Sequence, residues 1–99
     1  MSFEQQANVK SLEIEAIKGN LEEVKRLVLI CKVDISSCDY RVFKGVACEI
    51  IRDYLENFKN NDIKFKNLIK VMKFFVDDCG ASLDILPKHC SAVLKFLLD

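Results

Sequence analysis

Apolar residues recur at the spacing of one helical face in five stretches of the chain, and short polar segments separate these stretches. The spacing predicts helices over residues 8–18, 21–31, 44–57, 63–78 and 87–98. Isolated helices of this length are marginal in water, so each must bury its apolar stripe against a neighbour. We therefore expect an all-α fold of about five helices.

The stripes also predict which side chains are covered. For the helix predicted over residues 44–57, the covered face comprises Ala47, Ile50, Ile51, Tyr54, Leu55 and, just after it, Phe58. In residues 63–78 it comprises Phe65, Leu68, Ile69, Met72, Phe75, Val76 and Cys79. Residues 1–7 carry little pattern and are predicted to be a frayed leader. Residues 35–41 have no helical period, so we expect a connector there.

Gly19 and Asn20 interrupt the first two predicted helices. Glycine adopts the left-handed conformation that ends many helices at no steric cost. Asparagine can cap the next helix by accepting a hydrogen bond from the amide of Glu22 or Glu23. Gly19 and Asn20 together therefore predict a tight turn between two helices.

An internal repeat relates residues 24–35 to residues 72–83, which lie 48 positions later. In this alignment Leu27 falls on Phe75 and Cys31 falls on Cys79. The two stretches continue as KVDIS and as GASLD, so both are expected to end in the same way. We predict that Leu27 and Phe75 occupy equivalent places in two neighbouring helix pairs.

Length and charge narrow the class of protein. The 99 residues suit one domain covering residues 1–99. Fifteen basic and fifteen acidic residues cancel, whereas proteins that hold nucleic acid through its phosphates are usually basic. No basic segment followed by an apolar run marks a secretory signal, and no apolar stretch is long enough to span a bilayer. We expect an intracellular, cytoplasmic location.

Cysteine and histidine give no sign of a catalytic or metal site. The five cysteines form no C-x-x-C pair, and we expect most of them to be small buried side chains in a reducing compartment. His89 and Cys90 are adjacent, so on a helix they point about 100° apart and cannot act as base and nucleophile. No glycine-rich phosphate loop is present. We predict no catalytic residue, no metal and no cofactor.

A run of lysines offers a different surface. Lys59, Lys64, Lys66, Lys70 and Lys73, opposed only by Asp62, give residues 57–73 a net charge of +4. Such a patch can contact an acidic partner, RNA or a lipid surface, but a solvated helix face is the better explanation of these lysines. We expect Lys66, Lys70 and Lys73 on the exposed side of their helix.

The first helix-turn-helix resembles an ankyrin repeat. The residues that carry the resemblance are Leu12, Ala16, Gly19, Asn20, Leu21, Val24, Leu27, Val28, Asp34 and Ile35. KVDIS stands where the family commonly has GADVN, with one extra residue near Cys31. Two positions depart from the family pattern: KSLE replaces its T-P-L-H tetrapeptide, and Glu15 replaces the first alanine of its Ala-Ala pair.

This resemblance implies a short solenoid of helix pairs that binds another protein and catalyses no reaction. Ankyrin arrays bind with their finger tips and with the first helix of each pair. By position, the tip would comprise Ser37, Cys38, Asp39, Tyr40 and Arg41, and the first helices would contribute Glu13, Ile17, Lys18, Glu49 and Arg52. Tyr40 and Arg41 are the strongest candidates, because tyrosine and arginine dominate interface energetics.

Two alternatives remain open from the sequence. One is a compact bundle of five or six helices, as in death-domain-like adaptors or pathogen effectors, which would share the interaction role but present a different surface. The other is a small helical protein that binds RNA or an acidic partner through the lysines of residues 59–73, or an enzyme that uses His89.

Overall fold

The computed structural model describes residues 3–57 and 63–98, and these residues form helices and no strand. The elements are α1 (Phe3–Ile17), α2 (Leu21–Leu29), α3 (Ser37–Asn57), α4 (Ile63–Asp77), the 3-10 turn η1 (Leu83–Ile85) and α5 (Lys88–Leu98). The predicted all-α fold of five helices is confirmed.

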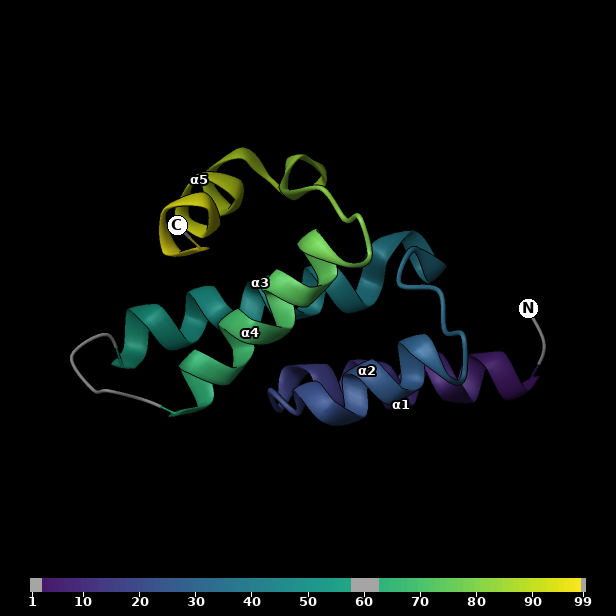
Figure 1. Ribbon diagram of the computed structural model, residues 1–99. Helices are drawn as coiled ribbons and strands as arrows, with labels where there is room; N and C mark the ends of the chain where they lie inside the picture. The colour runs from purple at the N-terminus through teal and green to yellow at the C-terminus, as the bar shows by residue number, and fades with distance from the viewer. Residues whose placement is uncertain (1–2, 58–62, 99) are drawn as a thin grey trace.

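The helices lie in three tiers (Figure 1). The hairpin of α1 and α2 forms the lowest tier, α3 and α4 form the middle tier, and α5 lies above them. Helix α1 packs against both α2 and α3, α2 packs against α4, and α3 packs against α4 and α5. Helices α3 and α4 each pack on both the lower and the upper tier, and so join all three.

The turn between α1 and α2 forms as predicted. Gly19 has φ +78°, its amide donates to the carbonyl of Ala16 at 3.0 Å, and the amide of Asn20 donates to the carbonyl of Glu15 at 3.0 Å. These are the two hydrogen bonds of a Schellman helix end. The side-chain oxygen of Asn20 accepts from the amide of Glu23 at 3.4 Å and caps α2.

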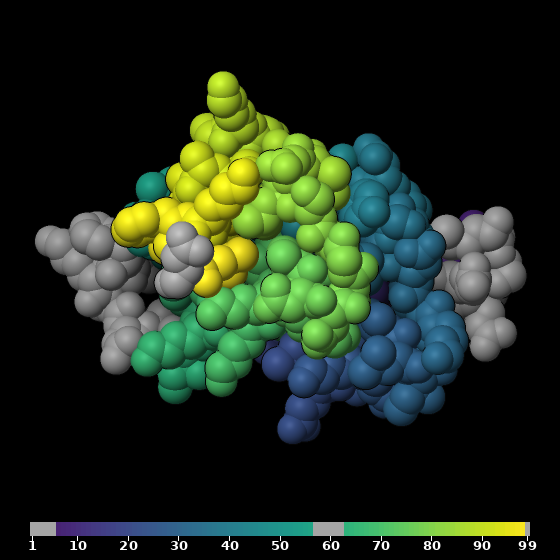
Figure 2. All heavy atoms as spheres, turned by 45° about the horizontal axis from the view of Figure 1, so that its top comes forward, coloured from purple at the N-terminus to yellow at the C-terminus, as the bar shows by residue number. Residues whose placement is uncertain are grey.

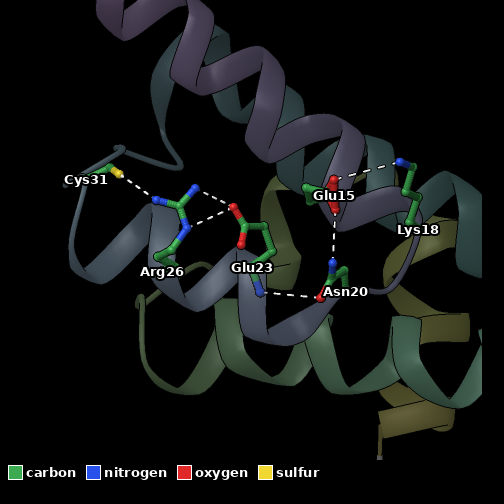
Figure 3. Close-up of polar contacts among 6 residues, drawn as sticks. All are labelled: Glu15, Lys18, Asn20, Glu23, Arg26 and Cys31. Atoms are coloured by element: carbon green, nitrogen blue, oxygen red, sulfur yellow. Dashed lines mark hydrogen bonds and ion pairs between the residues drawn. The ribbon is translucent and has the colours of Figure 1, made fainter.

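Side-chain contacts reinforce this hairpin (Figure 3). The Asn20 amide group donates to the carboxylate of Glu15 at 3.1 Å, which ties the end of α1 to the start of α2. Arg26 donates to the carboxylate of Glu23 and to the sulfur of Cys31, the latter at 3.6 Å. The hydrogen bond from Arg26 lowers the pKa of Glu23 and, reciprocally, raises that of Arg26.

The core runs through all three tiers. Its fully buried large side chains are Phe43, Phe75, Leu12, Ile50, Leu68, Met72, Leu94, Val24, Val42, Val46 and Val71. The rings of Phe43 on α3 and Phe75 on α4 meet edge to face, with centroids 6.3 Å apart. Phe43 lies outside every predicted stripe, so the tertiary structure alone reveals this aromatic contact at the centre of the molecule.

The predicted repeat appears in the backbone hydrogen bonds that end α2 and α4. The carbonyl of Leu27 accepts from the amide of Val33 at 3.1 Å, and the carbonyl of Phe75 accepts from the amide of Ala81 at 3.0 Å. Both pairs are related by the same shift of 48 positions. The amides of Ile30 and Cys31 bond to the Arg26 carbonyl just as those of Asp78 and Cys79 bond to that of Phe74.

The next residues repeat as well. Lys32 has φ +59° and Gly80, its counterpart, has φ +75°. Asp34 then accepts from the amide of Ser36 at 2.9 Å, as Ser82 accepts from the amide of Asp84 at 3.1 Å. Hydrogen bonds from the hydroxyl and the amide of Ser36 lower the pKa of Asp34. Leu27 and Phe75 therefore begin two chain segments of the same conformation.

This equivalence predicts that Lys32→Gly stabilises the protein. A left-handed conformation costs a residue with a Cβ atom about 1–2 kcal/mol, and the greater freedom of glycine in the unfolded chain offsets about half of that gain. We expect the free energy of unfolding to rise by about 0.5–1 kcal/mol in urea denaturation. Lys32→Ala, which keeps the Cβ atom, is the matched control, and an equal rise in both variants would contradict this explanation.

Several sequence predictions need correction. Residues 3–7 belong to α1 and are not a frayed leader, because no glycine or proline precedes Gly19 to stop the helix. Helix α2 ends at Leu29, two residues before the predicted end, where the chain turns toward the left-handed Lys32. Leu55 is exposed, at 70%, since it lies three residues after exposed Arg52 on the outer side of α3.

In α4 the predicted stripe is too narrow. Val71 and Phe74 are buried together with the predicted Leu68, Met72 and Phe75. Helix α4 is covered by both α2 and α3, so a wider face is removed from water than one stripe provides. The predicted exposure of Lys66, Lys70 and Lys73 is confirmed.

Candidate functional site

The structure brings together two of the predicted binding residues, one from each of two neighbouring helices. Glu13 lies on α1 and Arg41 lies near the start of α3, and the Arg41 Nε atom is 3.1 Å from the Glu13 carboxylate. The Arg41 side chain remains 65% exposed in this ion pair. The pair therefore lies at the surface where α1 and α3 meet, and its guanidinium group is open to a further contact.

A cavity of about 330 Å³ opens beside this ion pair. Its lining residues are Gln6, Val9, Lys10, Glu13, Cys38 and Arg41. Val9 is buried and belongs to the core, whereas the other lining side chains are polar or are cysteine. The cavity thus combines a small apolar floor with a charged rim.

The sequence prediction missed Gln6, Val9 and Lys10 as parts of this surface. A signal for two of them is present, since Gln6, Lys10 and Glu13 follow each other at the i, i+4, i+7 spacing of one helical face. The assignment of residues 1–7 to a leader concealed that spacing. Only the observed length of α1 makes these side chains neighbours of Arg41.

The backbone beside the cavity adopts a strained conformation. Cys38, Asp39 and Tyr40 have φ values of +57°, +58° and +60°, in the left-handed region that disfavours residues with a Cβ atom. Lys44 pairs with Asp39 at 2.9 Å, and the Tyr40 ring meets the Phe43 ring edge to face at 6.4 Å. Such strain persists only where surrounding contacts hold it, and it is concentrated at functional sites.

The predicted tip residues lie at the kink that precedes the right-handed part of α3. Cys38, Asp39 and Tyr40 form a left-handed turn within the range of α3, and the right-handed part of the helix follows this turn. Val42 and Phe43 are buried directly after this turn, and Arg41 pairs with Glu13, so the segment lies against α1. Cys38, Asp39 and Arg41 are exposed, whereas Ser37 and Tyr40 are half-buried.

The other predicted residues on α1 lie farther along the helix. Ile17 is half-buried, and its methyl group lies 4.0 Å from the position of a Cβ atom on Gly45, so it contributes to packing between α1 and α3. Lys18 follows at the end of α1 and pairs with Glu15 at 3.8 Å. Neither residue lines the cavity.

The predicted residues in the middle of α3 form a separate charged group. Arg52 donates to the Glu49 carboxylate at 2.7 Å, and Lys64 of α4 approaches the same carboxylate at 3.6 Å. Arg52 lies 11 residues after Arg41, or about 16 Å along a helix, and on the same side. Glu49 and Arg52 therefore lie outside the cavity, and Glu49 contacts α4 and not α1 in the ion pairs of this group.

The thiols differ from the prediction. All five cysteines are free, and none is buried: Cys38 and Cys48 are exposed, whereas Cys31, Cys79 and Cys90 are half-buried. Cys48 is exposed because it lies four residues before Arg52, on the outer side of α3. Burial, with a smaller contribution from the charge of Asp78, raises the pKa of Cys79, which keeps this thiol protonated and unreactive near neutral pH.

Neither a metal-binding group nor a membrane-spanning helix occurs in the described parts of the chain. Within residues 3–57 and 63–98, histidine, cysteine and acidic side chains form no group of three that could hold a metal ion. In the same parts of the chain, no helix combines the length and the apolar character that crossing a membrane requires.

The chain was also compared with known proteins. Neither the family descriptions, nor the curated proteins, nor the solved structures include a match to this sequence or fold. The case for a function therefore comes from the geometry of the α1–α3 face.

Proposed function

We propose that this chain is a non-enzymatic protein-recognition module of the ankyrin type, and that it binds its partner protein with the α1–α3 face. This face comprises the cavity between α1 and the start of α3 together with the exposed residues that continue along α3. The observation that carries the proposal is the exposed Arg41 and Glu13 pair at the rim of a cavity whose neighbouring backbone is strained.

The helix arrangement supports the ankyrin type over a compact bundle. First helices pack side by side, as α1 does with α3, and second helices do the same, as α2 does with α4. Backbone hydrogen bonds that repeat at a shift of 48 positions give the two pairs a common ending. Repeated endings are expected in stacked units, whereas a bundle of unrelated helices has no physical need for them.

The chemistry of the face supports a protein partner. Arginine is enriched at interface hot spots because its planar guanidinium group combines several donors with a surface that packs well. Arg41 already has one carboxylate contact and is 65% exposed, so it can donate to a partner without losing Glu13. The apolar floor at Val9 offers a place for an apolar side chain of that partner.

The proposal predicts that Arg41→Glu abolishes partner capture. The tagged protein is incubated with a lysate of the cells that produce it, and captured proteins are compared between variants. We expect at least about a tenfold loss of a specific partner, because removal of a hot-spot arginine typically costs about 2 kcal/mol or more. Arg26→Glu on α2, which reverses the same charge and breaks a similar ion pair away from this face, is expected to retain capture.

A charge swap separates recognition from internal stability. The double variant Glu13→Arg/Arg41→Glu restores the ion pair between α1 and α3 with opposite polarity. If Arg41 contacts the partner directly, capture stays lost in the swapped protein although it folds normally by circular dichroism. Recovery of capture in the swap, or its loss with Arg26→Glu, would contradict the proposed contact.

A further inference from the structure

A second charged surface lies where α2 and α4 pack together, away from the cavity of the α1–α3 face. Lys25 on α2 and Lys70 and Lys73 on α4 line a shallow depression of about 260 Å³ over the ring of Phe74. The Lys25 ammonium group lies 5.8 Å from the centre of that ring. Lys66 lies one helical turn before Lys70 and is exposed like the others. We call these four residues the α2–α4 lysine surface.

None of these four lysines has a carboxylate partner among the described residues. The residues whose cationic groups form ion pairs are Lys18, Arg26, Arg41, Lys44, Arg52, Lys64 and Lys95. Lys10, Lys32 and Lys88 form no ion pair with a described residue either, but they lie apart on other segments, whereas Lys25, Lys66, Lys70 and Lys73 are gathered on α2 and α4. Like charges at the i, i+4 spacing of Lys66 and Lys70 weaken a helix. An anionic partner would offset this repulsion.

The surroundings decide which kind of anion fits. Asp77 and Asp78 line the same depression at the end of α4, and exposed Glu22 precedes Lys25 by three residues. A nucleic acid strand presents one phosphate after another, so it would be repelled at this acidic end. A protein segment can place carboxylates opposite the lysines and a neutral or basic side chain opposite the aspartates. The charge pattern therefore favours a peptide.

The spacing of the lysines suggests the shape of that peptide. Lys66, Lys70 and Lys73 follow each other at i, i+4 and i+7, so their Cα atoms span about 10 Å along one side of α4. In a space-filling view α4 lies open between the atoms of α2 and those of the C-terminal segment (Figure 2). A helix with glutamates at the same spacing, lying along α4, can reach all three ammonium groups.

We propose that the α2–α4 lysine surface binds an acidic helical segment of a partner protein, as a second contact independent of the α1–α3 face. The glutamates of that segment pair with Lys66, Lys70 and Lys73, and Lys25 adds a fourth positive charge from the neighbouring helix.

The test uses a fluorescent helical peptide with glutamates at i, i+4 and i+7, and its binding is measured by anisotropy at low salt. We expect Lys66→Glu/Lys70→Glu to weaken binding about tenfold or more, because two attractive contacts become repulsive. Lys32→Glu/Lys88→Glu changes the net charge equally at two exposed lysines outside this surface and is expected to bind as the unaltered protein does. A peptide with glutamines in place of the glutamates should show no saturable binding.

Three results would overturn this proposal. One is equal weakening by the two double variants, which would reduce the effect to net charge. The second is tighter binding of a single-stranded RNA or of vesicles rich in anionic lipid than of the acidic peptide. The third is undetectable peptide binding to the unaltered protein. Because Arg41→Glu leaves the lysine surface intact, it should retain peptide binding, so this test and that of the α1–α3 face can fail separately.

Discussion

Phe75→Ala is expected to lower the free energy of unfolding by about 3–5 kcal/mol, the largest loss of any substitution considered for this protein. Phe75 is fully buried, and its ring meets that of Phe43 of α3 edge to face. The centroids of the Phe75 and Phe74 rings are 6.0 Å apart. Removal of the Phe75 ring eliminates apolar contact and leaves a cavity that the surrounding helices can fill only in part. Urea denaturation followed by circular dichroism measures the change.

The control for this prediction is another phenylalanine on a helix. Phe96 on α5 is 74% exposed, so Phe96→Ala should change the free energy of unfolding by less than about 0.5 kcal/mol. A comparable loss in the two variants would mean that Phe75 does not hold the α3 and α4 interface. If Phe75→Ala is too unstable to purify, Phe75→Leu retains part of the volume and should show a smaller loss in the same direction.

The second large effect concerns the turn between α1 and α2, where we expect Gly19→Ala to cost about 2–4 kcal/mol. Two causes add. Gly19 has φ +78°, which is unfavourable for alanine, and an added Cβ atom would lie 2.8 Å from the Cβ atom of Asn67 on α4. The backbone of Asn67 and Leu68 is 3.4 Å away, so the turn can relieve this clash only by moving away from α4.

Gly80→Ala separates these two causes. Gly80 has a similar φ of +75°, but a Cβ atom there meets no atom within 4 Å. This variant should therefore lose only the conformational contribution, about 1 kcal/mol. The difference between the two variants, measured by urea denaturation, gives the steric contribution of the contact with Asn67. Equal losses would show that α4 does not pack closely on the turn.

Both predictions concern the frame that supports the two proposed binding surfaces. The contact between Phe43 and Phe75 fixes α3 against α4, and Gly19 lets the first hairpin approach α4 closely. Arg41 can meet Glu13 only if α3 lies beside α1, and Lys25 can lie over Phe74 only if α2 lies beside α4. Loss of either packing contact should therefore weaken both surfaces.

The candidate site was predicted from the sequence only in part. The resemblance to ankyrin repeats drew attention to Glu13 and Arg41, and the structure places these two side chains together. It also placed residues 37–41 in an exposed finger, and the structure shows a left-handed turn at Cys38, Asp39 and Tyr40 that lies against α1. The polar composition of that segment indicated a connector, but no local signal indicated that the turn would be left-handed or that Arg41 would meet Glu13.

The sequence by itself determined the features that depend on near neighbours in the chain. Helical periodicity located all five helices, the Gly19 and Asn20 pair set the first turn, and the shift of 48 positions related the two helix endings. Each of these follows from backbone preferences and hydrogen bonds between residues at most six positions apart, so the local pattern suffices.

Only the tertiary structure decided the features that depend on which helices meet. The contact of Phe43 with Phe75, the left-handed turn at Cys38, the cavity beside Arg41 and the unpaired lysines across α2 and α4 all join distant parts of the chain. These features are stabilised by packing and by charge interactions between segments far apart in the sequence. No single stretch of sequence indicates that such segments lie close together in space. An apolar stripe indicates that one face of a helix is buried. Which neighbouring helix buries it is known only from the tertiary structure.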